Sequence, residues 1–275
     1  MRFIQHKREA YWFYRFVSPL YDRWVNPLFW TEPMRAAALA LARLDRPDLT
    51  TVDVGAGTGF ATEGIVERVD PERVTLLDQS PDQLRRAAAK PALRACERVL
   101  GDAERLPFAT DSVDRYVSCG SVEYWPAPQR AIAEAYRVLR PGGIALVTGP
   151  LPPTGRLARA LADAWMLFPR EADYRVWFER AGFDAIETRR LRAPWRDGAG
   201  EGAPYALAIA GRKPAPGPSP FVPDDDDDAV EDPGAPLTPR ELLRSAGRFA
   251  LGSLAGAAFV PIGAWLNLRA RRRRP

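Results

Sequence analysis

The sequence has very little histidine and cysteine, and both shortages narrow the chemistry open to the chain. His6 is the one histidine in 275 residues, and Cys96 and Cys119 are the two cysteines. They form no spacing typical of a metal-ligand set, so we expect no metal site and interpret both cysteines as reduced core residues. Residues 1–7 lack an apolar run and a cleavage site, so no signal or transit peptide is predicted.

The sequence also lacks a large excess of positive or negative residues, since its formal net charge is +4. The charges are unevenly placed, with an acidic run at 224–228 and an arginine-rich run at 269–274. No basic stripe interleaved with aromatic residues precedes these runs, so we expect no nucleic-acid partner. With 46% hydrophobic residues, the chain is able to bury a sizeable core.

The composition divides the chain into four parts. Residues 1–45 are rich in aromatic residues and predict a helical lead-in that ends in a helix over 33–44. This lead-in either packs on the following domain or covers a ligand as a lid. Residues 46–212 alternate strand and helix patterns and predict an α/β domain. Residues 213–239 are rich in proline and aspartate, which predicts an extended or disordered linker, and 240–275 form the last part.

The last part contains an uncharged segment at 249–268. As a helix it would be about 30 Å long, which matches the hydrocarbon core of a bilayer. We therefore expect residues 240–275 to form a hydrophobic anchor helix that attaches the chain to a membrane. A full span would carry the terminal arginines away from the cytosol, against the positive-inside tendency. A tail that lies in the membrane interface and a soluble helix on a partner are both open alternatives, and the oligomeric state stays unknown.

A hydrophobic strand runs into a glycine-rich turn between Val52 and Phe60. Gly55, Gly57 and Gly59 have GxGxG spacing, and Phe60 stands where a pyrophosphate-binding turn has its third glycine. This spacing is typical of S-adenosylmethionine (SAM) methyltransferases. Asp78 ends the next expected strand, where a carboxylate can accept hydrogen bonds from both ribose hydroxyls. The pattern predicts a βαβ unit that binds SAM.

Further segments extend this unit into an α/β fold, a Rossmann-like class I SAM methyltransferase sheet with helices on both faces. After strands at the turn and at 76–78, we expect strands at 97–100, at 114–120 and beyond a helix stop at 141–143. These strands should be parallel, with later strands at 185–191 and 205–210 and helices at 156–168 and 171–181. The Asp102 side chain is expected on the adenine amino group, with the Ala103 backbone beside it.

Several longer runs make the chain similar to a known family. They are RFIQHKREAYWFYRF at 2–16, NPLFWTEPMR at 26–35, LLDQSPDQL at 76–84, DRYVSCGSVEYWPAPQRAIAEAYRVLRPGG and DAWMLFPREADYRVWFERAGF. In these runs the chain resembles the plant and algal inner-envelope methyltransferases that act on 2-methyl-6-phytyl- and 2-methyl-6-solanyl-1,4-benzoquinol in tocopherol and plastoquinone synthesis. The resemblance implies a SAM-dependent C-methyltransferase with a prenylated quinol substrate and a hydrophobic C-terminal anchor.

The resemblance also implies SAM contacts, at Gly55, Gly57, Gly59, Asp78, Gln79, Asp102 and Ala103. Asp53 and Cys119 complete the set that we predict for the cofactor. The acidic run in the linker and the arginine-rich terminus depart from the family pattern, which leaves the host and compartment open. We expect a membrane-associated enzyme whose catalytic domain lies where SAM is present, at the cytosolic face of a bacterial membrane or at the plastid inner envelope.

Methylation of a ring carbon next to a phenol needs a base, because the carbon is a poor nucleophile until the hydroxyl loses its proton. The candidates are His6, Glu123 and Asp22, with Tyr124 as a competitor. His6 titrates near neutral pH. Glu123 and Tyr124 follow the strand at 114–120, at the carboxyl edge where α/β proteins bind ligands. Each residue also has a non-catalytic explanation. His6 would be a surface residue, Glu123 a helix cap and Tyr124 part of the core.

Two other functions are compatible with the sequence. A SAM-dependent methyltransferase of another membrane lipid, such as a sterol, a phospholipid or a menaquinone-type quinol, would use the same fold. A membrane-anchored scaffold with a vestigial SAM pocket would perform no chemistry, although the intact glycines and acids argue against it.

Overall fold

The structure is a computed structural model, and it describes residues 30–153, 159, 167–192 and 204–222. His6, Asp22 and the predicted anchor at 249–268 lie outside the described residues, as does most of the helix expected over 156–168. Within the described ranges, no helix is both long enough and apolar enough to cross a membrane.

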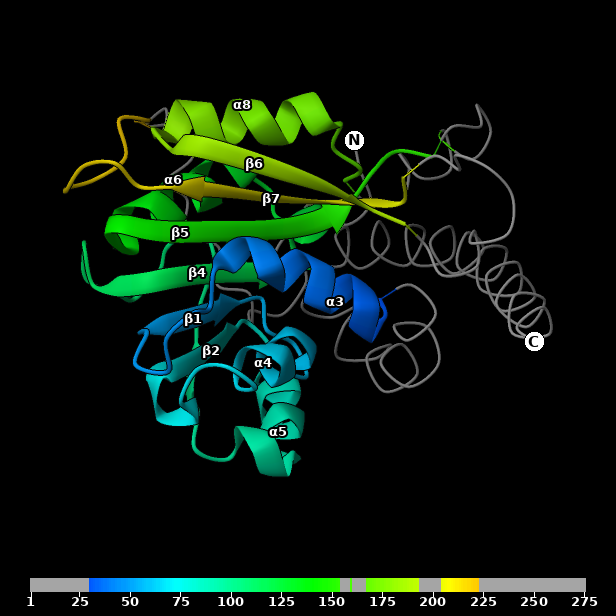
Figure 1. The fold of residues 1–275 in the computed structure, drawn as a ribbon, viewed down its shortest axis with the longest axis vertical. Coiled ribbons are helices and arrows are strands. Elements are labelled where there is room, and N and C mark those ends of the chain that lie inside the picture. The colour runs from blue at the N-terminus through cyan, green and yellow to red at the C-terminus, as the bar shows by residue number, and fades with distance from the viewer. Residues whose placement is uncertain (1–29, 154–158, 160–166, 193–203, 223–275) are drawn as a thin grey trace, which may run out of the picture.

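A seven-stranded sheet forms the centre of the molecule, in the order β3-β2-β1-β4-β5-β7-β6 (Figure 1). Strands β1 to β5 pair in parallel, and β7 lies antiparallel between β5 and β6. The expected parallel unit is therefore confirmed for the first five strands, and the late strands make the sheet mixed. The bounds are β1 Thr51–Val54, β2 Val74–Asp78, β3 Glu97–Leu100, β4 Val113–Cys119, β5 Leu139–Pro150, β6 Asp184–Leu191 and β7 Ala206–Arg212.

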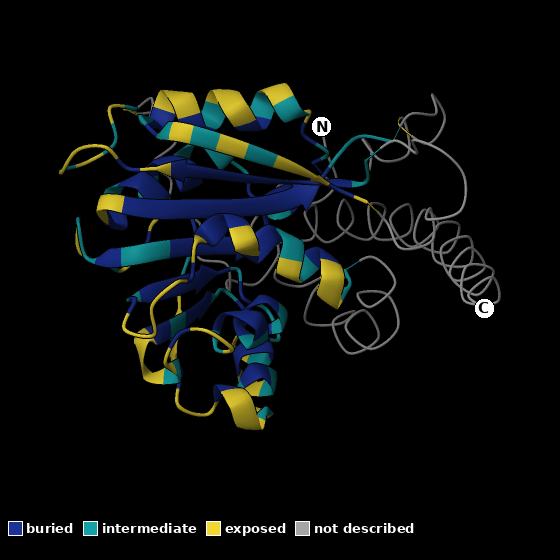
Figure 2. Cartoon of the chain, in the orientation of Figure 1, coloured by how far each residue is buried: buried dark blue, intermediate teal, exposed yellow. Residues whose placement is uncertain are grey.

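Helices cover both faces of this sheet, as predicted, and each face has its own hydrophobic cluster. One cluster joins α3, α4 and α5 to strand residues such as Leu76 and Leu146. The other joins α6 and α8 to residues such as Tyr116 and Val147. The inner strands such as β1 and β7 are consequently buried between the helices, whereas the edge strands β3 and β6 are largely exposed (Figure 2). The bounds are α3 Glu32–Leu39, α4 Phe60–Ile65, α5 Pro81–Ala89, α6 Pro128–Val138 and α8 Glu171–Ala181.

Two helix ends differ from the expected positions. The helix expected over 33–44 begins at Glu32 and stops at Leu39, continues as a 3-10 turn over Ala40–Ala42, and ends at Arg43 in the left-handed region with φ of 49°. Helix α6 ends at Val138, before the Pro-Gly-Gly stop at 141–143, because the next residue is already extended. That residue, Leu139, pairs with Val113 of β4 as the first residue of β5.

The segment expected to begin an extended linker instead packs on the domain as far as it is described, to residue 222. Lys213 is fully buried, and its Nζ donates to Asp111 Oδ1 at 2.6 Å and to the Gly217 carbonyl at 2.7 Å. The Gly217 N–H donates to the other Asp111 oxygen at 2.9 Å. The division of the chain into four parts stays a prediction, but the packed contacts of the α/β domain extend beyond residue 212.

Replacing Lys213 by methionine is expected to lower the free energy of unfolding by about 2–3 kcal/mol, because Asp111 would lose the buried cation that pairs with it. Lys90→Met is the matched control. Its ion pair with Glu63 has about a third of each side chain exposed, so a loss below about 1 kcal/mol is expected there. Urea unfolding followed by circular dichroism measures both variants. Equal losses would contradict a special role for the buried lysine.

Candidate active site

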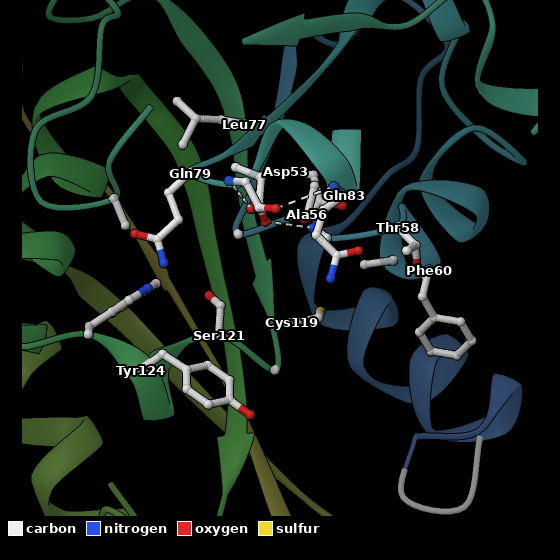
Figure 3. Close-up of a pocket in the computed structure, with 18 of the residues that line it drawn as sticks. Asp53, Ala56, Thr58, Phe60, Leu77, Gln79, Gln83, Cys119, Ser121 and Tyr124 are labelled. Atoms are coloured by element: carbon white, nitrogen blue, oxygen red, sulfur yellow. Dashed lines mark hydrogen bonds between the residues drawn. The ribbon is translucent and has the colours of Figure 1, made fainter. Parts of the chain in front are cut away.

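A pocket lies at the carboxyl ends of the parallel strands, the edge where α/β sheets bind ligands (Figure 3). Its wall is formed by the loops after β1, β2, β3 and β4, together with α3. All but one of the predicted cofactor residues line this pocket: Asp53, Gly55, Gly57, Asp78, Gln79, Asp102, Ala103 and Cys119. The structure thus brings together residues that are far apart in the sequence.

Asp78 joins the loops that follow β1 and β2. Its Oδ2 accepts the Gly57 N–H at 2.8 Å, and its Oδ1 accepts the Ser80 N–H at 2.8 Å. Since each oxygen accepts one backbone N–H, the orientation of the carboxylate is fixed where it meets the pocket. A carboxylate held in this way is suited to accept further hydrogen bonds from paired hydroxyls.

The glycines of the turn satisfy different steric requirements. Gly57 has φ of +54°, and a Cβ added to it would meet nothing within 4 Å, so the turn leaves open space at the pocket wall. A Cβ on Gly55, at φ of +68°, would lie 2.5 Å from the Ser121 Cβ. Gly59 caps α4 and packs against Leu93, outside the pocket lining. The open space at Gly57 fits a ligand that lies directly on the backbone.

Asp53 is a buried acid in the pocket wall. Its Oδ2 accepts the Thr62 hydroxyl at 2.6 Å, whereas its Oδ1 has no hydrogen-bond partner among the described residues. Burial raises the pKa of Asp53 to about 7, and the nearby charge of Asp78 adds to this increase. The pocket wall therefore contains a buried acceptor that no donor of the described residues satisfies.

The loop after β3 is tied to the loop before α6. Glu104, which the sequence analysis did not single out, is buried in the pocket wall, and its Oε1 accepts the Ala127 N–H at 2.7 Å. Asp102 Oδ1 accepts the Glu104 N–H at 3.0 Å, which fixes the turn that carries Asp102 and Ala103. These contacts place both predicted adenine-binding residues at the pocket.

The end of β4 forms the opposite part of the wall. Both cysteines are free thiols. The Cys119 thiol bonds to the Thr148 hydroxyl at 3.7 Å, and burial, with a contribution from Asp53, raises its pKa to about 12. The thiol stays protonated at neutral pH and is a poor nucleophile. Beyond it, Ser121 Oγ lies 2.6 Å from Ser118 Oγ, which fixes the chain as it leaves the strand.

The described end of the lead-in both packs on the domain and borders the pocket. Met34 and Leu39 of α3 are buried in the core, whereas Trp30 and Arg35 line the pocket. Gly120 lies directly beneath Trp30, since a Cβ on this glycine would be 3.2 Å from the indole ring. The run NPLFWTEPMR contains both pocket residues, but nothing in its composition indicates which side chains turn toward a ligand.

Of the candidate bases His6, Glu123 and Asp22, Glu123 is the one that the structure describes, and it does not line the pocket. Glu123 is 4% exposed, and no described residue forms a hydrogen bond with its Oε2. Burial raises its pKa to about 8. Glu123 is absent from the pocket lining, although its neighbours Tyr124 and Trp125 belong to it. His6 and Asp22 lie outside the described residues.

The chain is similar to proteins of known activity and fold. A family model described as a methyltransferase domain matches residues 52–147. The chain is 52% identical to a chloroplastic 2-methyl-6-phytyl-1,4-hydroquinone methyltransferase of Arabidopsis thaliana, over 97% of this chain and 78% of that protein. It is 50% identical to the Spinacia oleracea protein of the same name, over 97% and 76%.

A solved structure from Thermotoga maritima shares the fold. It is a SAM-dependent methyltransferase, described as a possible histamine N-methyltransferase, and matches with a TM-score of 0.57 at 22% identity. The match covers 76% of this chain and 100% of that chain. The predicted Rossmann-like SAM methyltransferase fold is therefore confirmed.

If the turn binds the cofactor as the sequence predicts, Gly57→Ala is expected to weaken binding of S-adenosylhomocysteine by at least about tenfold, because the added methyl group would fill the open space at the turn. Gly142→Ala is the matched control, since Gly142 also has positive φ and open space but lies away from the pocket. Both variants should lose about 1 kcal/mol of stability from backbone strain. Calorimetric titration and urea unfolding measure the two effects, and equal cofactor affinity in both variants would contradict the assignment.

Proposed function

The chain belongs to the family of 2-methyl-6-phytyl-1,4-hydroquinone methyltransferases, and from this premise we propose that it methylates a ring carbon of a prenylated benzoquinol. It is a SAM-dependent methyltransferase. The observation that carries the proposal is the extent of the similarity. It covers nearly the whole chain, well beyond the SAM-binding turn that many methyltransferases share. The experiment described below also identifies the prenyl chain and the ring substitution of the natural acceptor.

We propose that the pocket holds SAM along the carboxyl edge of the sheet. Asp102 and Ala103 would contact the adenine, and Asp78, with Gln79 beside it, would accept the ribose hydroxyls. The glycine turn, Asp53 and Cys119 would border the methionine part. When bound, SAM supplies an electrophilic methyl group on its sulfonium. The fixed Asp78 carboxylate, the open space at Gly57 and the unpartnered Asp53 oxygen support this assignment.

The acceptor ring would lie against the aromatic part of the wall. Trp30, Phe60, Tyr124 and Trp125 line the pocket and offer flat apolar surfaces to a quinol ring. A base then removes the phenol proton and raises the electron density on the neighbouring ring carbon. We propose His6, Glu123 or Asp22 for this role. The pKa of Glu123 is raised to about 8, so this group holds a proton near neutral pH. Glu123 itself does not line the pocket, whereas the next two residues, Tyr124 and Trp125, do.

The proposed reaction is tested with full-length protein in detergent, labelled SAM and 2-methyl-6-phytyl-1,4-benzoquinol. We expect a labelled methyl group on a ring carbon, with its position determined by mass spectrometry and NMR. A lipid extract of the host is the parallel acceptor. Transfer only to a sterol, a phospholipid or another quinone in that extract would contradict the prenyl-benzoquinol substrate, and SAM binding without any transfer would favour a scaffold.

At least one of His6→Gln, Glu123→Gln and Asp22→Asn is expected to lower turnover more than about a hundredfold while SAM still binds. Because the pKa of Glu123 is about 8, a reaction that uses its carboxylate should speed up as the pH rises through about 8. Glu123→Gln would abolish this rise. Turnover within about threefold of wild type in all three variants would exclude the proposed set of bases.

We also propose that the segment 249–268 holds the enzyme at a membrane surface, in the compartment that contains SAM. A prenylated quinol partitions into lipid, so a tethered enzyme can take its acceptor from the bilayer. The membrane surface would be the cytosolic face of a bacterial membrane or a plastid inner envelope. The names of the plant relatives place those proteins in chloroplasts.

Ending the chain at Pro239 tests the tether. The shortened enzyme is expected to methylate short-chain quinols at the wild-type rate but to work poorly on long-chain quinols in vesicles. A chain that ends at residue 268 is the matched control, since it keeps the uncharged segment and loses only the arginine-rich run. Equal rates of the Pro239 form on both acceptors would argue against a membrane role.

A further inference from the structure

The charges around the pocket are unequally distributed. Four acidic side chains belong to its wall, Asp53, Asp78, Asp102 and Glu104, whereas Arg35 is the one basic side chain among the described lining residues. SAM itself carries a carboxylate on its methionine part. An acidic pocket would repel this group unless a cation lies at the correct end.

Arg35 is held rigidly at the wall. Its Nη1 donates to the Phe60 carbonyl at 3.0 Å, and its guanidinium lies 4.8 Å from the centre of the Phe60 ring. Gly64 makes room for it, since a Cβ on this glycine would lie 2.8 Å from Arg35 Nε. The side chain is only 11% exposed, and the one ion pair that it forms with a described residue is to Glu67, which is 64% exposed. Such an exposed partner contributes little to binding the guanidinium.

The position of Arg35 follows from the strand order. Along the carboxyl edge the strands run β3, β2, β1, β4, so adenine at Asp102 and ribose at Asp78 leave the methionine part near β1 and β4. Arg35 contacts Phe60, the first residue of α4 after the β1 turn. Its charge also acts on Cys119 at the end of β4, where it opposes the increase in the thiol pKa.

We propose that Arg35 binds the carboxylate of the methionine part of SAM. The inference rests on the proposed function only in taking SAM as the ligand of this pocket. A planar guanidinium that keeps its bond to the Phe60 carbonyl still has N–H donors for a carboxylate, and such charge-assisted bonds are short and strong. Arg35 would then connect α3 to the cofactor.

The test compares the affinities of two ligands that differ by one group, SAM and decarboxylated SAM, by calorimetric titration. The wild-type protein should bind SAM at least about tenfold more tightly than decarboxylated SAM. Arg35→Met should bring the two affinities within about threefold of each other, with decarboxylated SAM still bound as in wild type. Arg35→Lys keeps the positive charge but lacks the two parallel N–H donors of a guanidinium, so it should retain part of the preference for SAM over decarboxylated SAM.

Arg189→Met is the matched control. Arg189 donates to the Ala37 carbonyl at 3.0 Å and so contacts the same helix, α3, from β6. This variant should keep the full preference for SAM. Arg35→Met that weakens both ligands equally, or that keeps the preference, would overturn the role of Arg35 and leave the proposed function standing. A wild-type protein that binds neither ligand would overturn both.

Discussion

The carboxylate of Asp78 is the contact on which the pocket depends. It joins the turn after β1 to the loop after β2 through the N–H groups of Gly57 and Ser80. The same two loops are linked by the Leu77 carbonyl, which accepts the N–H groups of Gly55 and Ala56 at 2.8 and 3.1 Å. The turn is thus shaped before any ligand arrives, which lowers the cost of ordering it on binding.

The electrostatics of the pocket follow from this arrangement. Burial raises the pKa of Asp53 to about 7, and the charge of Asp78 adds to this increase. The acidic wall faces α3, which carries Arg35. The lead-in is consequently more than a packing element, since its described end supplies a cation and the indole of Trp30 to a pocket most of whose other described lining residues belong to the α/β domain.

Local patterns predicted the sheet and much of the site, because glycine spacing, strand hydrophobicity and the acid after β2 act over short distances. Features that depend on distant contacts were missed. Glu104 reaches the loop before α6, Arg35 reaches the start of α4, and Lys213 finds its carboxylate partner at Asp111. In the sequence, a lysine next to a proline-rich stretch looks like part of a solvated linker, because its carboxylate partner lies about a hundred residues away. The placement of Glu123 away from the pocket lining was equally invisible.

The role of the Asp78 carboxylate is tested most directly by the affinity of Asp78→Asn for S-adenosylhomocysteine. Asp82→Asn, on the neighbouring helix α5, is the control. An amide offers an N–H where the carboxylate accepts one, so it would oppose either Gly57 or Ser80 and distort the turn. The account predicts affinity at least about a hundredfold weaker at position 78 and unchanged at position 82, with both proteins folded. Binding within about threefold of wild type at position 78 would contradict it.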